Sequence, residues 1–315
     1  MDRNLALELV RVTEAAALAS ARFFGKGDPA AADHAAVSAM ELAIRGVNIN
    51  GRIIIGEEKI SEVSRLCSGE EVGASSEFEV DVALDCLECA GSLANGQPNS
   101  ISAIAIGQKN SFESFDEFYM RKIAVGSDAA GSIDLNASTF DNLVRIAEAK
   151  RTYVENLTVS ILERPRHKRL IEEVRQAGAR IELIKDGDLA AAIAAALPDT
   201  GVDVMMGIGG SKQGIIAAAA LACIQGGFQA QLIPDSMIET GEVPEERRKI
   251  YSIPDLIGSD NVMFAATGVS HSDFIEGVIF RPGGAVTNSV VFRGKSGTIR
   301  FLKTEHFFDK APDYT

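Results

Sequence analysis

The second half of the chain alternates between short apolar segments and segments with helical periodicity. We expect strands at 157–162, 180–184, 202–207 and 229–233. Helices are expected between them, at 166–177, 187–196 and 211–225. Because a helix that joins two strands can return the chain to the same end of a sheet, this order predicts parallel strands with helices on the faces of the sheet. The lack of Trp and the low aromatic content, 6%, also favour helices packed on sheets over an all-β sandwich.

The first half and the C-terminal end of the chain are less regular. An opening helix is expected, with an apolar face made of Leu5, Leu9, Val12 and Ala16. Asp28-Pro29 predicts the start of a second helix, because an acid at the N-cap and a proline in the first turn favour helix initiation. Further strands are expected at 52–56, 80–84, 100–106, 261–266, 276–281, 287–293 and 297–303. We therefore expect a layered α/β protein whose two halves, 1–150 and 151–315, pack closely and meet at a soft boundary near residue 150.

Charge and apolar content exclude several classes of function. Lys and Arg number 31 against 44 Asp and Glu, which gives a net charge of −13. Nucleic-acid binding needs basic surfaces that displace counterions, so a nucleic-acid partner is not expected. The longest apolar runs, 189–197 and 214–224, are too short to span a bilayer, and the N-terminus lacks the basic-then-apolar layout of a secretory leader. The four cysteines then predict reduced thiols in a cytoplasmic protein.

Four acids stand where strands or helices begin or end. Asp33 follows a helix start, Glu57 ends a strand after Gly56, and Asp85 and Glu88 follow another strand. Acids at strand ends converge on one edge of a sheet, where α/β proteins bind ligands. Carboxylates without a His or Cys framework suit hard cations such as Mg²⁺ or Mn²⁺. The alternative interpretation is a set of helix caps and solvated turns.

Three segments of the second half are suited to an anionic sugar. Arg164-Pro165-Arg166-His167 follows a strand and holds two guanidinium groups that match phosphate geometry. Asp186-Gly187-Asp188 follows the next strand and can accept hydrogen bonds from sugar hydroxyls. The glycine-rich turn 207–214 opens a helix, whose first N–H groups can bind an anion. This turn is neither a P-loop nor a dinucleotide fingerprint. Surface turns and helix caps remain the alternative for each segment.

The motifs along the whole chain resemble those of the class II fructose-1,6-bisphosphatase family, bacterial metal-dependent sugar-phosphate phosphatases. The shared motifs are Arg11-Val12-Thr13-Glu14, Gly27-Asp28, Ala32-Asp33, Val47-Asn48-Ile49, Ile55-Gly56-Glu57, Gly96-Gln97-Pro98-Asn99, Tyr119-Met120-Arg121-Lys122, Gly131-Ser132-Ile133-Asp134, Arg164-Pro165-Arg166-His167, Asp186-Gly187-Asp188, Gly207-Ile208-Gly209-Gly210 and Ser259-Asp260-Asn261-Val262. The resemblance implies the layered α/β/α/β/α sandwich of metal-dependent sugar and inositol phosphatases. It also implies a homodimer or tetramer, with a metal-binding first half and a substrate-binding second half.

The resemblance also implies a reaction and a set of site residues. The reaction is hydrolysis of the 1-phosphate of fructose 1,6-bisphosphate by water activated with Mn²⁺ or Mg²⁺, a step of gluconeogenesis. Metal ligands would be Asp33, Glu57, Asp85, Glu88 and, at a position where the family has glutamate, Gln213. Substrate contacts would come from Glu88, Cys89, Ala90, Tyr119, Arg164, Pro165, Arg166, Asp186, Gly187, Asp188 and Gly210.

Several positions depart from the family pattern, and they concern the chemistry. The family motif Asp-Pro-Ile/Leu-Glu-Gly-Thr is Asp85-Cys86-Leu87-Glu88-Cys89-Ala90 here, so the threonine that helps orient the attacking water is Ala90. The acid that acts with it is Ser61, and a lysine after Gly-Asp is Pro29. Serine is no base at neutral pH, and alanine cannot pass on a proton. Cys89 would also require an unfavourable backbone conformation if this turn uses positive φ.

Three hypotheses follow. The chain is a working sugar bisphosphatase with altered water activation. Alternatively, it is a catalytically silent paralogue that binds metal or sugar phosphate, or that forms a hetero-oligomer with an active subunit. A third hypothesis is a thiol-regulated sensor that uses Cys86 and Cys89.

Overall fold

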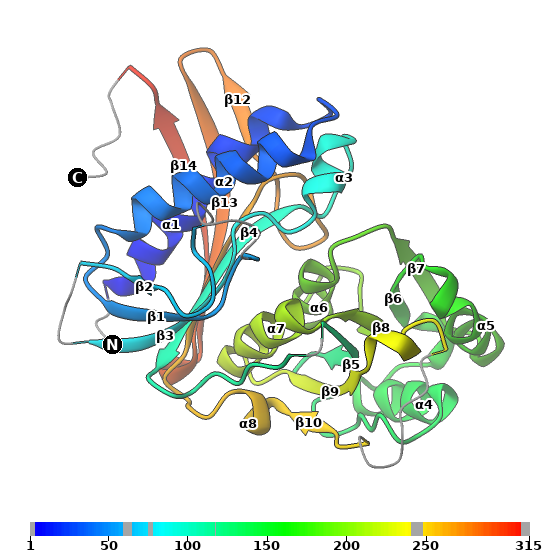
Figure 1. The fold of residues 1–315 in the computed structure, drawn as a ribbon. Coiled ribbons are helices and arrows are strands. Elements are labelled where there is room, and N and C mark those ends of the chain that lie inside the picture. The colour runs from blue at the N-terminus through cyan, green and yellow to red at the C-terminus, as the bar shows by residue number, and fades with distance from the viewer. Residues whose placement is uncertain (1–3, 59–64, 75–77, 117, 241–247, 310–315) are drawn as a thin grey trace. The chain divides into compact units, whose positions relative to one another are not determined.

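The computed structural model describes residues 4–58, 65–74, 78–116, 118–240 and 248–309. The chain forms two compact units, the first from Met1–Phe112 with Ser259–Thr315 and the second from Glu113–Gly258 (Figure 1). These limits differ from the boundary expected near residue 150. The reason is that the last strands of the chain return to the first sheet, where β11 (Met263–Gly268) pairs with β4 (Ile101–Gln108).

The first unit is built on a mixed sheet. Its other strands are β1 (Asn50–Ile55), β2 (Glu71–Val72), β3 (Glu79–Asp85), β12 (Ile279–Arg281), β13 (Gly284–Arg293) and β14 (Thr298–Phe307). Their order is β12-β13-β11-β4-β3-β1-β2, and β14 pairs with the free edge of β13. Strands β1 and β3 are parallel, whereas β3, β4, β11, β13 and β14 pair antiparallel in turn. The parallel β1–β3 pair brings the ends of both strands to one edge of the sheet.

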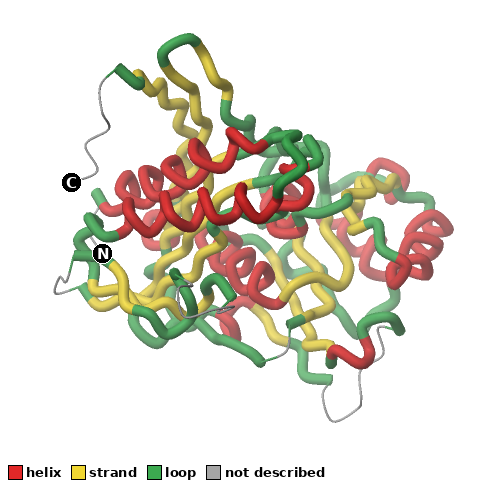
Figure 2. The backbone as a smooth tube through the Cα atoms, turned by 45° about the horizontal axis from the view of Figure 1, so that its top comes forward, coloured by secondary structure: helices red, strands yellow, loops and turns green. Residues whose placement is uncertain are grey.

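Two long helices cover one face of this sheet. Helix α1 (Leu5–Ser20) lies against β4, β11 and β13, and α2 (Pro29–Ile44) packs on α1 (Figures 1 and 2). Both were expected. The Asp28 side chain accepts a hydrogen bond of 3.0 Å from the Ala31 amide, and Pro29 occupies the first turn, so α2 begins as its sequence predicts. A third, short helix, α3 (Ala90–Ala94), follows β3.

The second unit holds a sheet in the order β10-β9-β5-β8-β6-β7. Its strands are β5 (Tyr119–Val125), β6 (Thr158–Leu162), β7 (Arg180–Ile184), β8 (Val204–Gly210), β9 (Gly227–Ile233) and β10 (Tyr251–Ser252). The expected parallel pairing is confirmed for β6 with β7 and β8. It is wrong for β9, because β5 lies between β8 and β9 and runs antiparallel to both. Strand β5 was not predicted.

Helices cover both faces of the second sheet. They are α4 (Thr139–Ala149), α5 (Lys168–Ala177), α6 (Asp188–Ala196), α7 (Ser211–Cys223) and the short α8 (Ile253–Leu256). Helices α4 and α5 share a buried cluster with Ile123 of β5, whereas the neighbouring Lys122 points to Asp188 of α6. Because side chains alternate along a strand, α4 and α5 lie on one face and α6 on the other. Single-turn 3-10 helices are η1 (Ala21–Phe23), η2 (Val154–Asn156), η3 (Pro165–His167), η4 (Asp235–Met237) and η6 (Gly294–Ser296).

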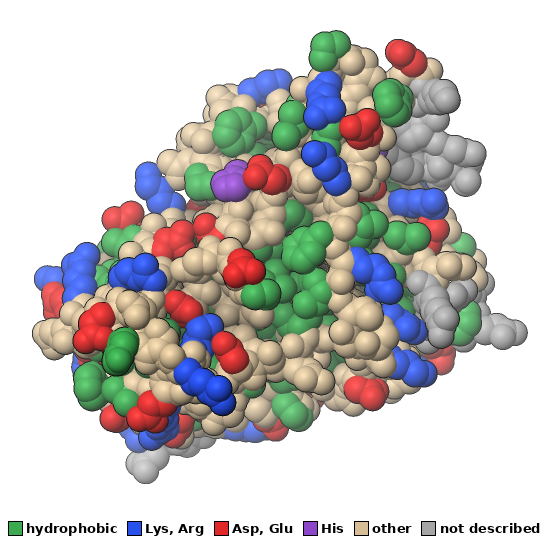
Figure 3. All heavy atoms as spheres, turned by 180° about the vertical axis from the view of Figure 1, so that it is seen from behind, with side chains coloured by type: hydrophobic (Ala, Val, Ile, Leu, Met, Phe, Trp, Pro, Cys, Tyr) green, Lys and Arg blue, Asp and Glu red, His purple; other side chains and the backbone are tan. Residues whose placement is uncertain are grey.

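The expected mixed α/β class is confirmed in both units. Among the described helices, none combines the length and apolarity needed to cross a bilayer. On the face shown in Figure 3, acidic and basic side chains are interspersed, with no continuous basic stripe.

Candidate functional site

In the first unit, three of the predicted acids lie close together around Cys86. Glu57 follows β1, and its Oε1 atom accepts a hydrogen bond of 3.0 Å from the Cys86 amide at the end of β3. The Cys86 thiol has a pKa well above its usual value, first because it is buried and then because Glu57, Asp85 and Asp33 surround it with negative charge. The structure therefore brings Asp33, Glu57 and Asp85 to one edge of the sheet, as parallel β1 and β3 require.

The ionisation of Asp33 shows how these acids affect one another. Burial and, second, the negative charge of Glu57 raise the pKa of Asp33 to about 6, while His34 opposes the shift. A cation between two such carboxylates would remove their repulsion, and oxygen donors suit Mg²⁺ or Mn²⁺. The chemistry of the donors therefore fits a hard cation. In the described parts of the chain, however, no three His, Cys, Asp or Glu side chains converge closely enough to coordinate one.

Glu88 is the fourth predicted acid of this unit. It is buried, 4% exposed, and its amide donates to the Ile101 carbonyl of β4 at 2.9 Å. This hydrogen bond fixes the chain directly after β3. The loop therefore has a defined backbone where the family motif departs from its usual sequence.

The departure at Cys89 has a backbone consequence that confirms the expectation. Cys89 precedes α3 with φ at +68°, in the left-handed region where glycine is favoured. Ala90 then opens α3. Gly56 of the neighbouring turn has a related requirement, because a Cβ atom there would overlap the Leu66 carbonyl oxygen. The chain therefore keeps the family glycine in the turn at Gly56, whereas Cys89 replaces the family glycine in the turn before α3.

The thiol hypothesis finds no support at Cys86. Cys86 and Cys89 form no disulfide with each other, and the Cys86 Sγ atom lies 3.4 Å from Sδ of Met40 inside the core. Reactive cysteines have a lowered pKa, whereas burial raises the pKa of Cys86. Ser61, the predicted substitute for the water-orienting acid, lies outside the described residues.

In the second unit, the two predicted arginines are held in different ways. The Arg164 guanidinium lies 2.5 Å from Oδ1 of Asp186 in an ion pair. Arg166 donates to the Ile208 carbonyl of β8 through Nε at 3.3 Å and through its terminal nitrogen at 3.0 Å, and its guanidinium lies 5.6 Å from the centroid of the Tyr119 ring. A carbonyl orients a guanidinium without neutralising it. Arg166 therefore keeps a net positive charge at this site, although burial lowers its pKa.

Asp188 lies opposite a lysine that the sequence analysis did not select. Asp188 is the first residue of α6, after Gly187 at φ +93°, and its Oδ2 atom lies 2.6 Å from Nζ of Lys122. Nζ also donates to the Gly210 carbonyl at 2.8 Å. A Cβ atom on Gly209 would overlap Asp188 Oδ2, so this glycine makes room for the pair. Lys122 thus joins the Asp186–Asp188 segment to the glycine turn, two of the predicted substrate segments.

His167 has a structural role. Its Nδ1 atom donates to the Leu162 carbonyl at 2.7 Å, while Nε2 accepts from the Ile208 amide at 2.7 Å. These two bonds require the neutral tautomer, and burial lowers the pKa of His167. His167 therefore fixes the Arg164–His167 segment against β8.

The glycine turn continues into α7 with Gly210 as its N-cap. A Cβ atom on Gly210 would overlap Oε1 of Gln213, so the Gln213 side chain folds back over the turn. Pro165 occupies the first position of η3 and directs the backbone between the two arginines.

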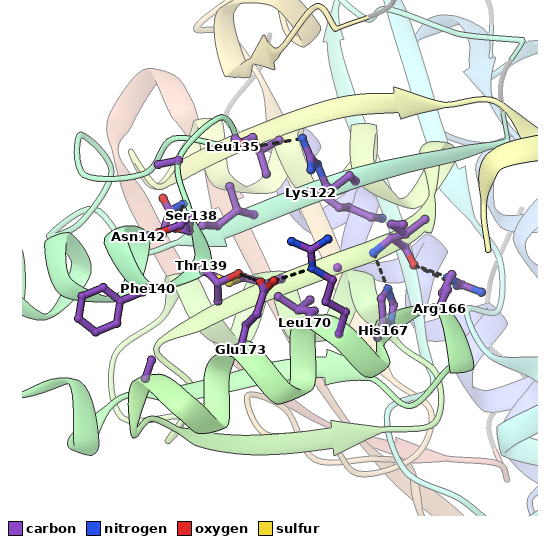
Figure 4. Close-up of a pocket in the computed structure, with 18 of the residues that line it drawn as sticks. Lys122, Leu135, Ser138, Thr139, Phe140, Asn142, Arg166, His167, Leu170 and Glu173 are labelled. Atoms are coloured by element: carbon purple, nitrogen blue, oxygen red, sulfur yellow. Dashed lines mark hydrogen bonds and ion pairs between the residues drawn. The ribbon is translucent and has the colours of Figure 1, made fainter. Parts of the chain in front are cut away.

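A cavity of about 700 Å³ lies beside these residues, between β5, β8, α4 and α5 (Figure 4). Arg166 and His167 form part of its wall, and Arg121 reaches it from β5, where its guanidinium donates to Gln231 at 2.6 Å. Glu173 also lines the cavity, and its carboxylate accepts hydrogen bonds from Thr139 at 2.6 Å and from Arg169 at 2.8 Å. The cavity gives the second unit a concave surface beside Arg166, lined by both polar and apolar side chains.

Comparisons with known proteins show the family of this chain. The model of the family described as bacterial fructose-1,6-bisphosphatase, glpX-encoded, matches residues 3–306. The D-fructose 1,6-bisphosphatase class 2/sedoheptulose 1,7-bisphosphatase of Microcystis aeruginosa is 38% identical over 342 aligned positions, with 100% of this chain and 99% of the relative covered. The protein of the same name from Synechococcus elongatus is 39% identical, with 98% of each chain covered. The chain therefore belongs to the bacterial, glpX-encoded family of fructose-1,6-bisphosphatases, the class II family that its motifs resemble.

Proposed function

We propose that this protein is a phosphatase that hydrolyses the 1-phosphate of fructose 1,6-bisphosphate with the help of Mn²⁺ or Mg²⁺, as a step of gluconeogenesis. The observation that carries the proposal is the state of Arg166. Two hydrogen bonds to the Ile208 carbonyl and the Tyr119 ring hold its guanidinium, and neither neutralises the charge. A phosphate dianion can pair with such a group through two parallel hydrogen bonds.

The remaining predicted substrate residues would give the site its selectivity for a sugar. Asp186 holds Arg164, and Asp188 holds Lys122, so these carboxylates orient cations while their other lone pairs can accept hydrogen bonds from hydroxyl groups. Gly187 and Gly210 allow the backbone of both segments to approach a ligand. We further propose a cytoplasmic location, where cysteines such as those of this chain remain as thiols.

In the first unit, Asp33, Glu57, Asp85 and Glu88 would hold the divalent cation. When bound, such ions polarise a phosphoryl group and lower the pKa of a water molecule. The Cys86 amide fixes Glu57 through its 3.0 Å hydrogen bond, which orients one carboxylate of the set. Burial and the repulsion from Glu57 together raise the pKa of Asp33 to about 6, and relief of that repulsion would favour cation uptake.

A second candidate function is favoured by the loop after β3. Ala90 has no hydroxyl to orient water, and Cys89 occupies a left-handed conformation at φ +68°. Pro29 stands where the family has a lysine, and there it serves as the first residue of α2. On this reading the protein binds metal or sugar phosphate without turnover, alone or as the partner of an active subunit.

The deciding experiment measures phosphate release from fructose 1,6-bisphosphate and from sedoheptulose 1,7-bisphosphate with Mn²⁺ or Mg²⁺. The enzyme proposal expects turnover that Asp85→Asn abolishes. If no phosphate is released although calorimetry shows that sugar bisphosphate binds, the protein is instead the catalytically silent paralogue of the second hypothesis. Asp85→Asn also serves as the control for a contaminating phosphatase, since a contaminant would give equal rates in both preparations.

A double variant tests the missing water-orienting pair. Ala90→Thr with Ser61→Asp should raise the rate by roughly two to four orders of magnitude, the usual contribution of proton-handling groups. The matched control is Ala90→Val with Ser61→Asn, which has nearly the same shapes without the hydroxyl and the carboxylate. Equal rates in the two double variants would contradict our account of Ala90 and Ser61.

A further inference from the structure

The cavity beside Arg166 is formed largely by residues outside the predicted substrate set. Of that set only Arg166 lies on its wall, whereas Asp186 and Asp188, the expected acceptors for sugar hydroxyls, do not. Among the described residues of the wall, Glu173 is the only carboxylate, and it already accepts two hydrogen bonds from neighbouring side chains. The cavity therefore offers no unengaged carboxylate to a polyol. Its volume of about 700 Å³ is nevertheless that of a small-molecule site.

Arg121 brings a cation to this wall that only neutral groups hold. Its Nη2 atom donates to Oε1 of Gln231 at 2.6 Å and to the Leu135 carbonyl at 3.4 Å. Within the described part of the chain, its buried Nε atom has no hydrogen-bond acceptor. Burial and, second, the positive charge of Arg248 lower the pKa of Arg121, but a guanidinium stays protonated in a protein. A buried donor without an acceptor is costly, so this side chain is suited to an anion.

The strand register places Arg121 and Arg166 on one row of the second sheet. Arg121 of β5 pairs with Ile208 of β8 on one side and with Gln231 of β9 on the other. The Arg121 guanidinium bonds to the Gln231 side chain, whereas the Arg166 guanidinium lies on the Ile208 carbonyl. Neighbouring strands are about 4.8 Å apart, so the two cations stand roughly two strand spacings apart. An anion at Arg121 therefore lies within the electrostatic field of Arg166.

The rest of the cavity wall near Arg121 is apolar. Ile123 of β5 pairs with Met206 of β8 in the next row on the same face of the sheet, and both are buried. Leu170 of α5 adds to this surface (Figure 4). Phe140, in the first turn of α4, also lines the cavity and is 57% exposed. An aromatic ring at the edge of a concave apolar surface is typical of a small-molecule site.

We propose that this cavity is a second ligand site, distinct from the sugar site, and that it binds a phosphate monoester with an apolar body. The phosphate pairs with the Arg121 guanidinium, whose Nε atom gains an acceptor. The apolar body lies on Ile123, Met206 and Leu170, and Phe140 covers its outer side. The proposal does not depend on turnover, because Arg121 belongs to neither the metal nor the substrate set.

Phenylphosphonate is a suitable probe, because a phosphatase does not hydrolyse its carbon–phosphorus bond. We expect calorimetry with the full-length protein to show binding, and Arg121→Gln to weaken it by roughly 10–100-fold, the usual value of a charge-assisted hydrogen bond. Arg145→Gln, at an exposed arginine of α4 outside the cavity wall, is the matched control and should leave the affinity unchanged. Circular dichroism of each variant verifies that it is folded.

A second variant tests the apolar part of the site at an exposed side chain. Phe140→Ala should weaken phenylphosphonate binding by about three- to tenfold, the value of one aromatic contact. It should not affect methylphosphonate, which has the same head group without the ring. The control is Phe301→Ala, which removes an exposed phenylalanine of the first unit. No binding of phenylphosphonate overturns the proposal, and so does binding that Arg121→Gln and Phe140→Ala leave unchanged.

Competition with the sugar distinguishes the two sites. Phenylphosphonate and fructose 1,6-bisphosphate should weaken each other's binding by the same factor, about twofold or more, because their phosphates repel across the row that holds Arg121 and Arg166. This coupling rests on the proposed function, whereas binding of the probe does not. Binding that depends on Arg121 but leaves the sugar affinity unchanged supports the second site and contradicts the proposed role of Arg166. Binding that Arg164→Ala abolishes and Arg121→Gln does not would place the probe in the sugar site and overturn the proposal.

Discussion

The Nζ atom of Lys122 lies 2.6 Å from Oδ2 of Asp188, and the two side chains are only 1% and 10% exposed. This pair joins the middle of β5 to the start of α6, and through the Gly210 carbonyl it also fixes the glycine turn. A buried ion pair stabilises a fold only weakly relative to an apolar substitute, but the loss of one partner leaves an unpaired buried charge. The pair therefore makes the geometry of the second unit sensitive to single substitutions.

We predict that Lys122→Met destabilises the protein by roughly 3–5 kcal/mol, because Asp188 would remain charged and buried. The measurement is the free energy of unfolding in urea at pH 7.5. The control is Lys109→Met, which breaks an exposed pair of similar length, 2.8 Å, with Glu79. It should cost no more than about 1 kcal/mol. Equal losses in the two variants would mean that burial of the Lys122–Asp188 pair has no energetic consequence.

Lys122 also explains why the sequence analysis did not predict β5, the strand that contains it. Several of the predicted strands, such as β6 and β8, are apolar runs that are buried on both faces. Strand β5 has the sequence Tyr-Met-Arg-Lys-Ile-Ala-Val, with two adjacent cations near its centre, so its hydrophobic pattern is weak until the Asp188 partner is known. The order of strands was missed for the same reason, since β5 is the strand that separates β8 from β9.

The candidate site was predictable where function depends on local sequence. The acids at the ends of β1 and β3 converge because parallel neighbouring strands end at one edge, and that follows from sequence position alone. The ion pair of Arg164 with Asp186 needs the parallel pairing of β6 and β7, which the strand–helix rhythm supplied. The carbonyl contact of Arg166 and the position of Arg121 at the cavity depend on tertiary packing, and no local signal indicates them.

His167 makes stability depend on pH. Its pKa is lowered in the folded state, so between that value and 6.5 the unfolded chain binds more protons than the folded one. The stabilisation is therefore present above the unfolded pKa and is lost as pH falls through the folded pKa. We expect the contribution of His167 to the free energy of unfolding to decrease below pH 6.5, and His167→Gln to remove this contribution from the pH dependence. The exposed His271→Gln serves as the control and should retain the slope of the unsubstituted protein.

Cys89 offers a test of backbone strain at the altered motif. We expect Cys89→Gly to be more stable than Cys89→Ala by about 1 kcal/mol, because only glycine adopts φ +68° without a penalty from Cβ. Both variants remove the sulfur, so their difference isolates the backbone term. Urea unfolding of the two proteins gives the comparison directly. An alanine variant as stable as the glycine variant would show that this turn relaxes at no cost.

The two arginines should contribute unequally to phosphate binding. Arg166→Ala should weaken fructose 1,6-bisphosphate binding by roughly 10–100-fold, the usual value of a charge-assisted hydrogen bond, because its charge has no acidic partner in the contacts that hold it. Arg164→Ala should cost less, since Asp186 already compensates the Arg164 charge. Calorimetry with metal-loaded protein measures both, whether or not the substrate is turned over. Arg169→Ala, a change at an exposed arginine, is the control.

Metal affinity should depend on the protonation of Asp33. Its pKa is raised to about 6 by burial and by Glu57, so at pH 5 about nine-tenths of Asp33 binds a proton that a cation must displace. We expect Mn²⁺ binding measured by calorimetry to be about tenfold weaker at pH 5 than at pH 7.5. In the folded protein without metal, the same shift means that stability falls as pH rises from 3.8 to about 6, because the folded state binds the proton more tightly than the unfolded chain.

The Asp33→Asn variant separates these two effects. It removes the repulsion with Glu57, so the metal-free protein should lose the decline in stability between pH 3.8 and about 6. It also removes a ligand, so Mn²⁺ affinity should fall at pH 7.5 and keep less of its pH dependence. Asp28→Asn, which retains an N-cap acceptor for Ala31, is the matched control on the same helix and should leave both properties unchanged. If Asp33→Asn binds Mn²⁺ as tightly as the unsubstituted protein at pH 7.5, then Asp33 is not a ligand, and the raised pKa reflects only its burial beside Glu57.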